Sequence, residues 1–154
     1  MPRDAVVALG HPWRGDDGVA LRVLDLLRKD SRLPSSVQLI DAAGSSMAAL
    51  HALSGRDKVL FIDCATMGEK PGVWRRFHPS DARSLKALPH LSLHEGDLFE
   101  TLEAAEALDD TAKEVVILGI EPESVEMGST LSPALENRLG EYVDQVVAEF
   151  TRNT

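Results

Sequence analysis

The sequence predicts a single-domain, three-layer α/β/α fold, with a mostly parallel twisted sheet of about five strands and helices on both of its faces. Three observations lead to this prediction. Short apolar runs alternate with amphipathic segments along the chain, as in parallel sheets whose crossovers are helices. The chain has 154 residues, 44% of them hydrophobic, which is the size of one ordinary domain. No repeat or low-complexity linker divides residues 1–154.

Each element is assigned from the spacing of its apolar residues. Strands are expected where apolar residues run together before a turn former, and helices where they recur every three or four positions. The apolar residues 73–77 are interrupted by Arg75 and Arg76, which indicates an edge strand. Ser132 can cap the last helix and Pro133 suits its first turn. In chain order we expect strand 5–9, helix 20–28, strand 37–40, helix 45–53, strand 58–62, strand 73–77, helix 95–108, strand 114–119 and helix 133–150.

Charge and composition exclude several classes of protein. With 25 acidic and 16 basic residues the formal net charge is -9, which disfavours nucleic acid and anionic membrane surfaces. No run approaches the roughly 20 apolar residues that span a bilayer, and the apolar run 5–9 is too short for a signal-peptide core. The single cysteine, Cys64, cannot form an internal disulfide. We therefore expect a cytoplasmic protein.

Carboxylates gather where the expected strands end. The first strand leads into Asp16 and Asp17, the second ends at Asp41 and the third at Asp63. Carboxyl ends of parallel strands share one edge of the sheet, where ligands bind, and a loop could bring His94 to the same edge. Oxygen and nitrogen ligands together suit nickel, zinc, iron or manganese. The alternative is that these aspartates only cap the following helices and that His94 is solvated.

Two other kinds of chemistry are disfavoured. On a strand Cys64 would point away from the face of Asp63, so a buried structural thiol is favoured over a nucleophile. His94-Glu95 begins like a zinc-protease helix, but Leu98 stands where the second histidine is required.

Four segments, in order, resemble the nickel hydrogenase maturation endopeptidases. They are residues 6–18, with the acidic turn Gly15-Asp16-Asp17-Gly18; residues 60–65 followed by the turn 68–73; the Leu93-His94 step; and residues 117–133, with Ile120-Glu121-Pro122-Glu123-Ser124. The resemblance covers nearly the whole chain. It implies an endopeptidase that removes a C-terminal extension from the precursor of a nickel hydrogenase large subunit, acting as a monomer in solution.

The resemblance also implies the site. The family binds nickel through residues that correspond to Asp17, Asp63 and His94, and the nickel arrives in the precursor rather than as a permanent cofactor. The ion could polarise the scissile carbonyl or activate a water, or Asp17 or Asp63 could act as a base; the sequence leaves these roles open.

The chain departs from the family at three places. His11 replaces an asparagine, and it either takes over the hydrogen bonding of that side chain, which we favour, or adds a ligand. The run Asp41-Ala42-Ala43-Gly44-Ser45 replaces a loop that is linked to substrate choice. His94 is followed by the acidic run Glu95-Gly96-Asp97, which we interpret as ordinary charge at a helix start. The altered loop keeps open a non-catalytic chaperone that binds a metal or a precursor, and a small-molecule hydrolase is a weaker alternative.

Overall fold

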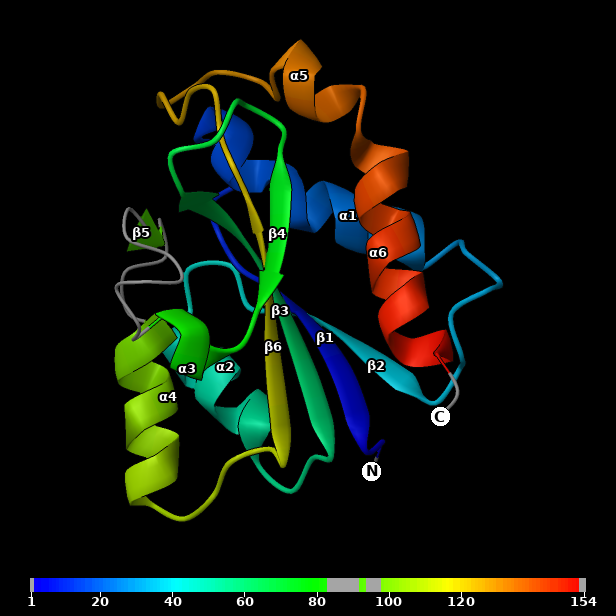
Figure 1. Cartoon of the computed structure of the whole chain (residues 1–154), viewed down its shortest axis with the longest axis vertical. Coiled ribbons are helices and arrows are strands. Elements are labelled where there is room, and N and C mark those ends of the chain that lie inside the picture. Colours follow the sequence, from blue (N-terminus) through cyan, green and yellow to red (C-terminus); the bar gives the residue numbers. More distant parts are fainter. Residues whose placement is uncertain (1, 83–91, 94–97, 153–154) are drawn as a thin grey trace.

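The computed structural model describes residues 2–82, 92–93 and 98–152, and the part of the chain in those ranges folds as strands alternating with helices (Figure 1). The strands are β1 Asp4–Ala8, β2 Val37–Asp41, β3 Lys58–Thr66, β4 Trp74–Phe77, β5 Ser92–Leu93 and β6 Glu114–Ile120. The helices are the 3₁₀ turn η1 Gly15–Gly18, α1 Val19–Leu27, α2 Ser46–Leu53, α3 Pro79–Ala82, α4 Leu98–Ala107, α5 Pro133–Glu136 and α6 Leu139–Thr151.

The main sheet has the strand order β2-β1-β3-β6-β4. The first four of these strands are parallel to one another, and β4 is antiparallel to β6 at the edge. The predicted sheet of about five mostly parallel strands is therefore confirmed, as is the edge position of residues 73–77. The short strand β5 pairs with the end of β3 and was not predicted, because two residues carry no periodicity.

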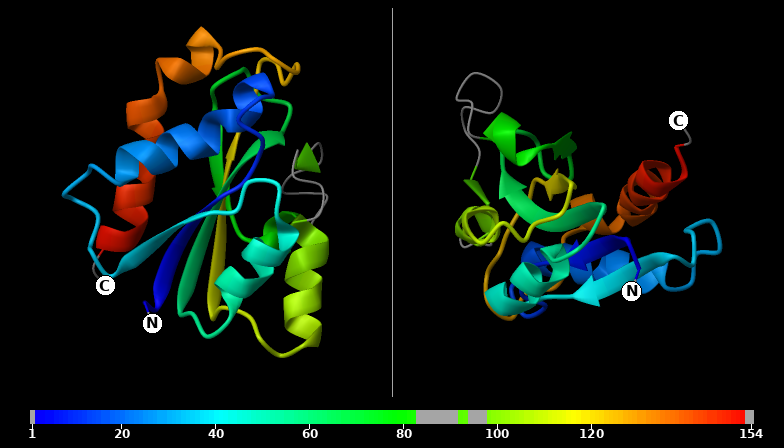
Figure 2. Two further views of the ribbon diagram at one scale, coloured as in Figure 1. Left: turned by 180° about the vertical axis from the view of Figure 1, so that it is seen from behind. Right: turned by 90° about the horizontal axis from the view of Figure 1, so that it is seen from below.

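Helices cover both faces of the sheet, which confirms the three layers (Figures 1 and 2). Helices α1 and α6 pack on one face over side chains such as Val6 and Leu60, and α2 and α4 pack on the other over Val7 and Phe61. Neighbouring residues of β1 and β3 thus enter opposite cores, as the alternation of side chains along a strand requires. Within the described residues, none of the helices is both long and apolar enough to cross a membrane.

Strand β3 is longer than predicted. The sequence placed its end at Asp63, but the strand continues to Thr66. Asp63 and Cys64 pair with Gly119 and Ile120 of β6, and the last two residues pair with β5. The acidic residue was interpreted as a stop signal, yet pairing on both sides keeps the backbone extended. Asp63 consequently lies inside the sheet rather than in a loop.

The last predicted helix is two helices, α5 and α6. The chain leaves helical geometry at Arg138, where φ is -111° and ψ is 5°. Periodicity could not reveal this break, because Leu135, Leu139 and Tyr142 keep helical spacing across it and all three are buried. The predicted cap is also wrong: Ser132 stands at the N-cap position, but its side chain makes no capping bond. The short helix α3 was not predicted either. For the helix expected over 95–108, the described part is α4, which covers Leu98–Ala107.

Candidate active site

The turn after β1 is shaped by one close approach. Gly10 has a φ of +104°, and a Cβ built on it would lie 2.1 Å from the backbone oxygen of Asp17 and 3.3 Å from its Oδ1. No other residue type fits such a backbone without strain. The chain therefore folds back after Gly10, and η1 brings Asp17 onto the end of β1. Asp17 is 4% exposed, and its Oδ2 accepts a hydrogen bond of 3.0 Å from the backbone N–H of His11.

Asp63 reaches the same corner from the neighbouring strand. Ala8 pairs with Ile62, and the N–H of Leu9 donates to the carbonyl of Ile62 at 3.0 Å, so Asp63 lies beside Leu9, one residue before Gly10. Adjacent strands lie about 4.8 Å apart. Asp63 is fully buried. Two carboxylates that are 46 positions apart in the sequence therefore lie at one carboxyl-end corner of the sheet.

The thiol of Cys64 is affected by the charge at this corner. Burial raises the pKa of its thiol well above the ordinary value, and the charges of Asp17 and Asp63 raise it further. Both carboxylates therefore lie within electrostatic reach of one sulfur atom. The thiol itself is buried in the core beneath α1 and donates to the backbone oxygen of Asp16 at 2.8 Å. The prediction of a buried cysteine is confirmed.

Asp16 has a different surrounding from its neighbour. Its Oδ1 accepts from the N–H of Ser132 at 2.7 Å, and its Oδ2 accepts from the Ser132 hydroxyl at 2.9 Å and from the N–H groups of Glu123 and Ser124 at 2.8 and 3.2 Å. The side chain is fully buried. Four donors hold this carboxylate, which thereby ties the turn after β1 to the segment after β6. This is why Ser132 does not cap α5.

Glu121 lies at the edge of the site, and its role was not predicted from the sequence. It is buried, and its Oε1 accepts from the N–H groups of Met67 and Glu69 at 2.7 and 3.0 Å. It thereby fixes the turn that follows β3. Its place directly after an apolar strand, like that of the predicted aspartates, was the signal that could have identified it.

The remaining predicted residues are placed differently. Asp41 ends β2 at the same edge but is exposed, and its Oδ1 accepts from the N–H of Ala43 at 3.0 Å. The ring of His11 lies towards the altered loop, with its Cε1 3.7 Å from the position of a Cβ on Gly44. His94 lies outside the described residues. Among the residues that the structure does describe, no three His, Cys, Asp or Glu side chains are arranged to hold a metal ion, so His11 does not complete a ligand set with Asp17 and Asp63 there.

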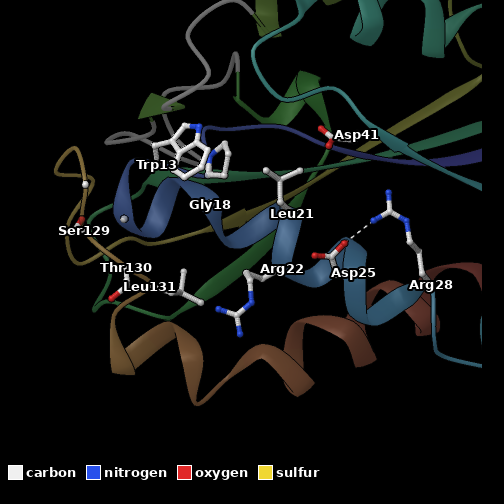
Figure 3. Close-up of a pocket in the computed structure, with 13 residues that line it drawn as sticks. Trp13, Gly18, Leu21, Arg22, Asp25, Arg28, Asp41, Ser129, Thr130 and Leu131 are labelled. Carbon is white, nitrogen blue, oxygen red and sulfur yellow. Dashed lines mark hydrogen bonds and ion pairs between the residues drawn. The ribbon is translucent and has the colours of Figure 1, made fainter.

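A groove of about 580 Å³ opens beside this corner (Figure 3). Gly15 and Gly18, which bracket Asp16 and Asp17 in η1, both line it. Its other lining residues come from the turn before η1, the exposed side of α1, the end of β2 and the segment 128–131.

Comparisons with known proteins agree with this architecture. A family model described as hydrogenase maturation protease (HycI) matches residues 21–149, a range that begins after Asp17 and includes Asp63. The chain is 24% identical over 147 residues to the Hydrogenase 2 maturation protease of Escherichia coli K12, covering 95% of this chain and 89% of that one. It is 23% identical to the hydrogenase expression/formation protein HupD of Thiocapsa roseopersicina, covering 95% of this chain but 66% of that longer protein.

Solved structures share the fold. The hydrogenase maturating endopeptidase HybD from E. coli superposes with a TM-score of 0.79 at 22% identity, over 95% of this chain and 91% of that chain. The [NiFe] hydrogenase maturation protease HycI from Thermococcus kodakarensis KOD1 gives a TM-score of 0.71 at 20% identity, over 98% and 94%. The family-model match spans most of the chain. This chain therefore belongs to the hydrogenase maturation protease family, a family of endopeptidases.

Proposed function

We propose that this endopeptidase removes a C-terminal extension from the precursor of a nickel hydrogenase large subunit, and that it senses the nickel carried by that precursor through Asp17, Asp63 and His94. The observation that carries the proposal is that two buried carboxylates, Asp17 in η1 and Asp63 in β3, lie at the carboxyl end of the sheet. The similarity to the Hydrogenase 2 maturation protease of E. coli supports the choice of substrate.

The donor set suits an ion that the substrate brings. Carboxylate oxygens with an imidazole nitrogen fit a borderline divalent cation such as nickel. Two fixed carboxylates and one histidine leave coordination positions open, which is what an ion already held by the precursor requires. When bound there, the ion would supply a Lewis acid. Asp17 and Asp63 would hold it there, Asp17 kept in place by the N–H of His11.

The same carboxylates offer a base for the attacking water. A carboxylate in hydrogen-bond reach of a water can take its proton as the water attacks the scissile carbonyl. Asp63 lies buried inside β3, where its pairing with Gly119 of β6 fixes its backbone, so little motion is needed to present it. We further propose that the reaction takes place in the cytoplasm, where the single free thiol of Cys64 is not challenged by disulfide formation.

The test is a gel that compares the length of a nickel-loaded precursor with and without the protein. We expect shortening by the wild-type protein, and its loss in Asp17→Asn, Asp63→Asn and His94→Ala. Asp144→Asn is the matched control, because this carboxylate on α6 is exposed and pairs only at the surface with Arg32. Cleavage that survives all three site changes would exclude the assigned site. Binding of the precursor without shortening would favour the chaperone that the altered loop at Asp41–Ser45 keeps open.

A further inference from the structure

The turn after β1 and the segment after β6 form one rigid rim. The N–H of Gly128 donates to the carbonyl of Trp13 at 2.7 Å, and the N–H of Gly15 donates to the carbonyl of Ser129 at 3.2 Å. The backbone N–H of Asp16 bonds the carbonyl of Ser124 at 2.9 Å, and the carboxylate of Asp16 adds its four bonds to the same segment. A rim tied at so many points is preorganised, which lowers the cost of binding a ligand against it.

The groove below this rim has a helical floor. Leu21, Arg22 and Asp25 of α1 line it, with Gly18 and Arg28 at the two ends of the helix, and their spacing of three, one, three and three makes a stripe along α1. The nine residues of α1 rise about 13 Å, which matches about four residues of extended chain. Figure 3 shows Trp13 and Leu21 to one side of the helix, and Leu131 and Arg22 to the other.

Large apolar side chains stand in solvent along this rim. Trp13 is 75% exposed and Met127 is 74% exposed, although the carbonyl of Trp13 is held by the N–H of Gly128. Tryptophan and methionine are enriched at protein–protein interfaces, and tryptophan dominates binding hot spots. An exposed indole on a preorganised loop beside a groove therefore marks a contact with another polypeptide.

Resting on the proposed function, we infer that the groove binds an extended, apolar segment of the precursor that adjoins the bond to be cut. Continuity with the site identifies this occupant, because Gly15 and Gly18 line the groove while Asp17 between them is buried at the site corner. A chain lying on α1 therefore leads straight to that corner. The charges favour a segment without net charge, because the lining contains two arginines and two aspartates, and Asp25 and Arg28 already pair at 2.6 Å.

Steady-state cleavage of the precursor tests the groove. We expect Trp13→Ala and Leu21→Ala each to raise KM roughly tenfold with kcat nearly unchanged, as truncation of a binding contact does. Leu108→Ala is the matched control. This leucine is 69% exposed, but it follows α4 at the opposite end of the sheet. The KM of the Leu108→Ala variant should therefore stay at the wild-type value. An unchanged KM in the Trp13 and Leu21 variants, with cleavage intact, would overturn the inference and leave the proposed function standing.

Fluorescence tests the groove without cleavage. The chain has two tryptophans, so Trp74→Phe leaves Trp13 as the only indole. Titration with a synthetic peptide spanning the cut site should shift the Trp13 emission to shorter wavelength, and Leu21→Ala should weaken that binding. No shift at saturating peptide would contradict the groove, whereas a shift without any shortening of the precursor would contradict only the proposed function. Sedimentation tests the alternative that a second copy of this chain occupies the groove. A wild-type dimer that Trp13→Ala converts to a monomer would assign the groove to that second copy.

Discussion

At the scale of single residues, the adjacent carboxylates Asp16 and Asp17 have different roles: Asp16 holds the fold together, and Asp17 is assigned to the active site. Asp16 accepts four hydrogen bonds in a fully buried position. In Asp16→Asn an NH₂ group replaces one carboxylate oxygen and cannot accept the hydrogen bonds of the surrounding donors. We therefore expect the free energy of unfolding to fall by about 2–4 kcal/mol. Urea denaturation measures it, and Asp144→Asn should stay within about 0.5 kcal/mol of wild type. If Asp16→Asn unfolds with the same free energy as the wild type, these four hydrogen bonds do not stabilise the contact between the turn after β1 and the segment after β6.

Cys64 gives a second prediction at this scale. Because burial and the nearby carboxylates raise the pKa of its thiol, the thiol stays protonated near neutral pH and is a poor nucleophile. We expect iodoacetamide to label it only after unfolding, and Cys64→Ala to keep the wild-type kcat for precursor shortening. Loss of cleavage by a folded Cys64→Ala protein would instead place sulfur in the chemistry.

At the scale of elements, the end of β1 depends on a missing side chain. A Cβ on Gly10 would overlap the backbone of Asp17, and the φ of +104° is strained for any other residue. We expect Gly10→Ala to lower the free energy of unfolding by roughly 2 kcal/mol or more and to abolish cleavage by displacing Asp17.

Gly140→Ala is the matched control for that prediction. Gly140 lies in α6 with nothing within 4 Å of its Cβ position, so alanine should stabilise the helix by about 0.5–1 kcal/mol. Thermal melts and the cleavage assay compare the two variants. Equal stability of both would show that the close approach at Gly10 does not fix the turn.

The elements also show what local pattern can predict. Residues 37–40, 58–62 and 114–119 were assigned as strands because apolar runs are a property of the local sequence, and β2, β3 and β6 confirm them. The extension of β3 beyond Asp63 depends on partners elsewhere in the chain. The same holds for Ser132: its local context indicates a cap, but a carboxylate 116 positions away takes its hydroxyl. These two misassigned features were thus decided by long-range contacts.

At the scale of the whole molecule, the strand order brings motifs that are far apart in the sequence together at the carboxyl end of the sheet. The sequence could place Asp17 and Asp63 at strand ends, and parallel pairing of β1 with β3 brings them together. In the structure the segment after β6 donates the hydrogen bonds that hold Asp16, so local pattern alone could not distinguish Asp17 from Asp16, a choice that came from the resemblance to the family. Nor could it reveal the groove, which exists between elements that are far apart in the chain.

Global stability should fall in alkaline solution because two buried protons are retained on folding. Burial raises the pKa of Cys64 and of Tyr142, whose hydroxyl donates to the carbonyl of Gly72 at 2.7 Å. The unfolded chain releases these protons near pH 8.5 and about pH 10 while the folded chain keeps them, so the unfolded state binds fewer protons and stability falls as pH rises. The expected slope is about 1.4 kcal/mol per pH unit for each group.

Urea midpoints measured from pH 7 to pH 11 check this slope, and two variants assign it. Cys64→Ala should remove the part that begins near pH 8.5, and Tyr142→Phe the part that begins near pH 10, because each lacks one of the retained protons. Tyr142→Phe should also lose about 1 kcal/mol at pH 7 with the hydrogen bond to Gly72. Since titration of surface lysines is common to all three proteins, differences between their curves isolate the two groups. Parallel curves for wild type and both variants would mean that neither proton is held by the fold.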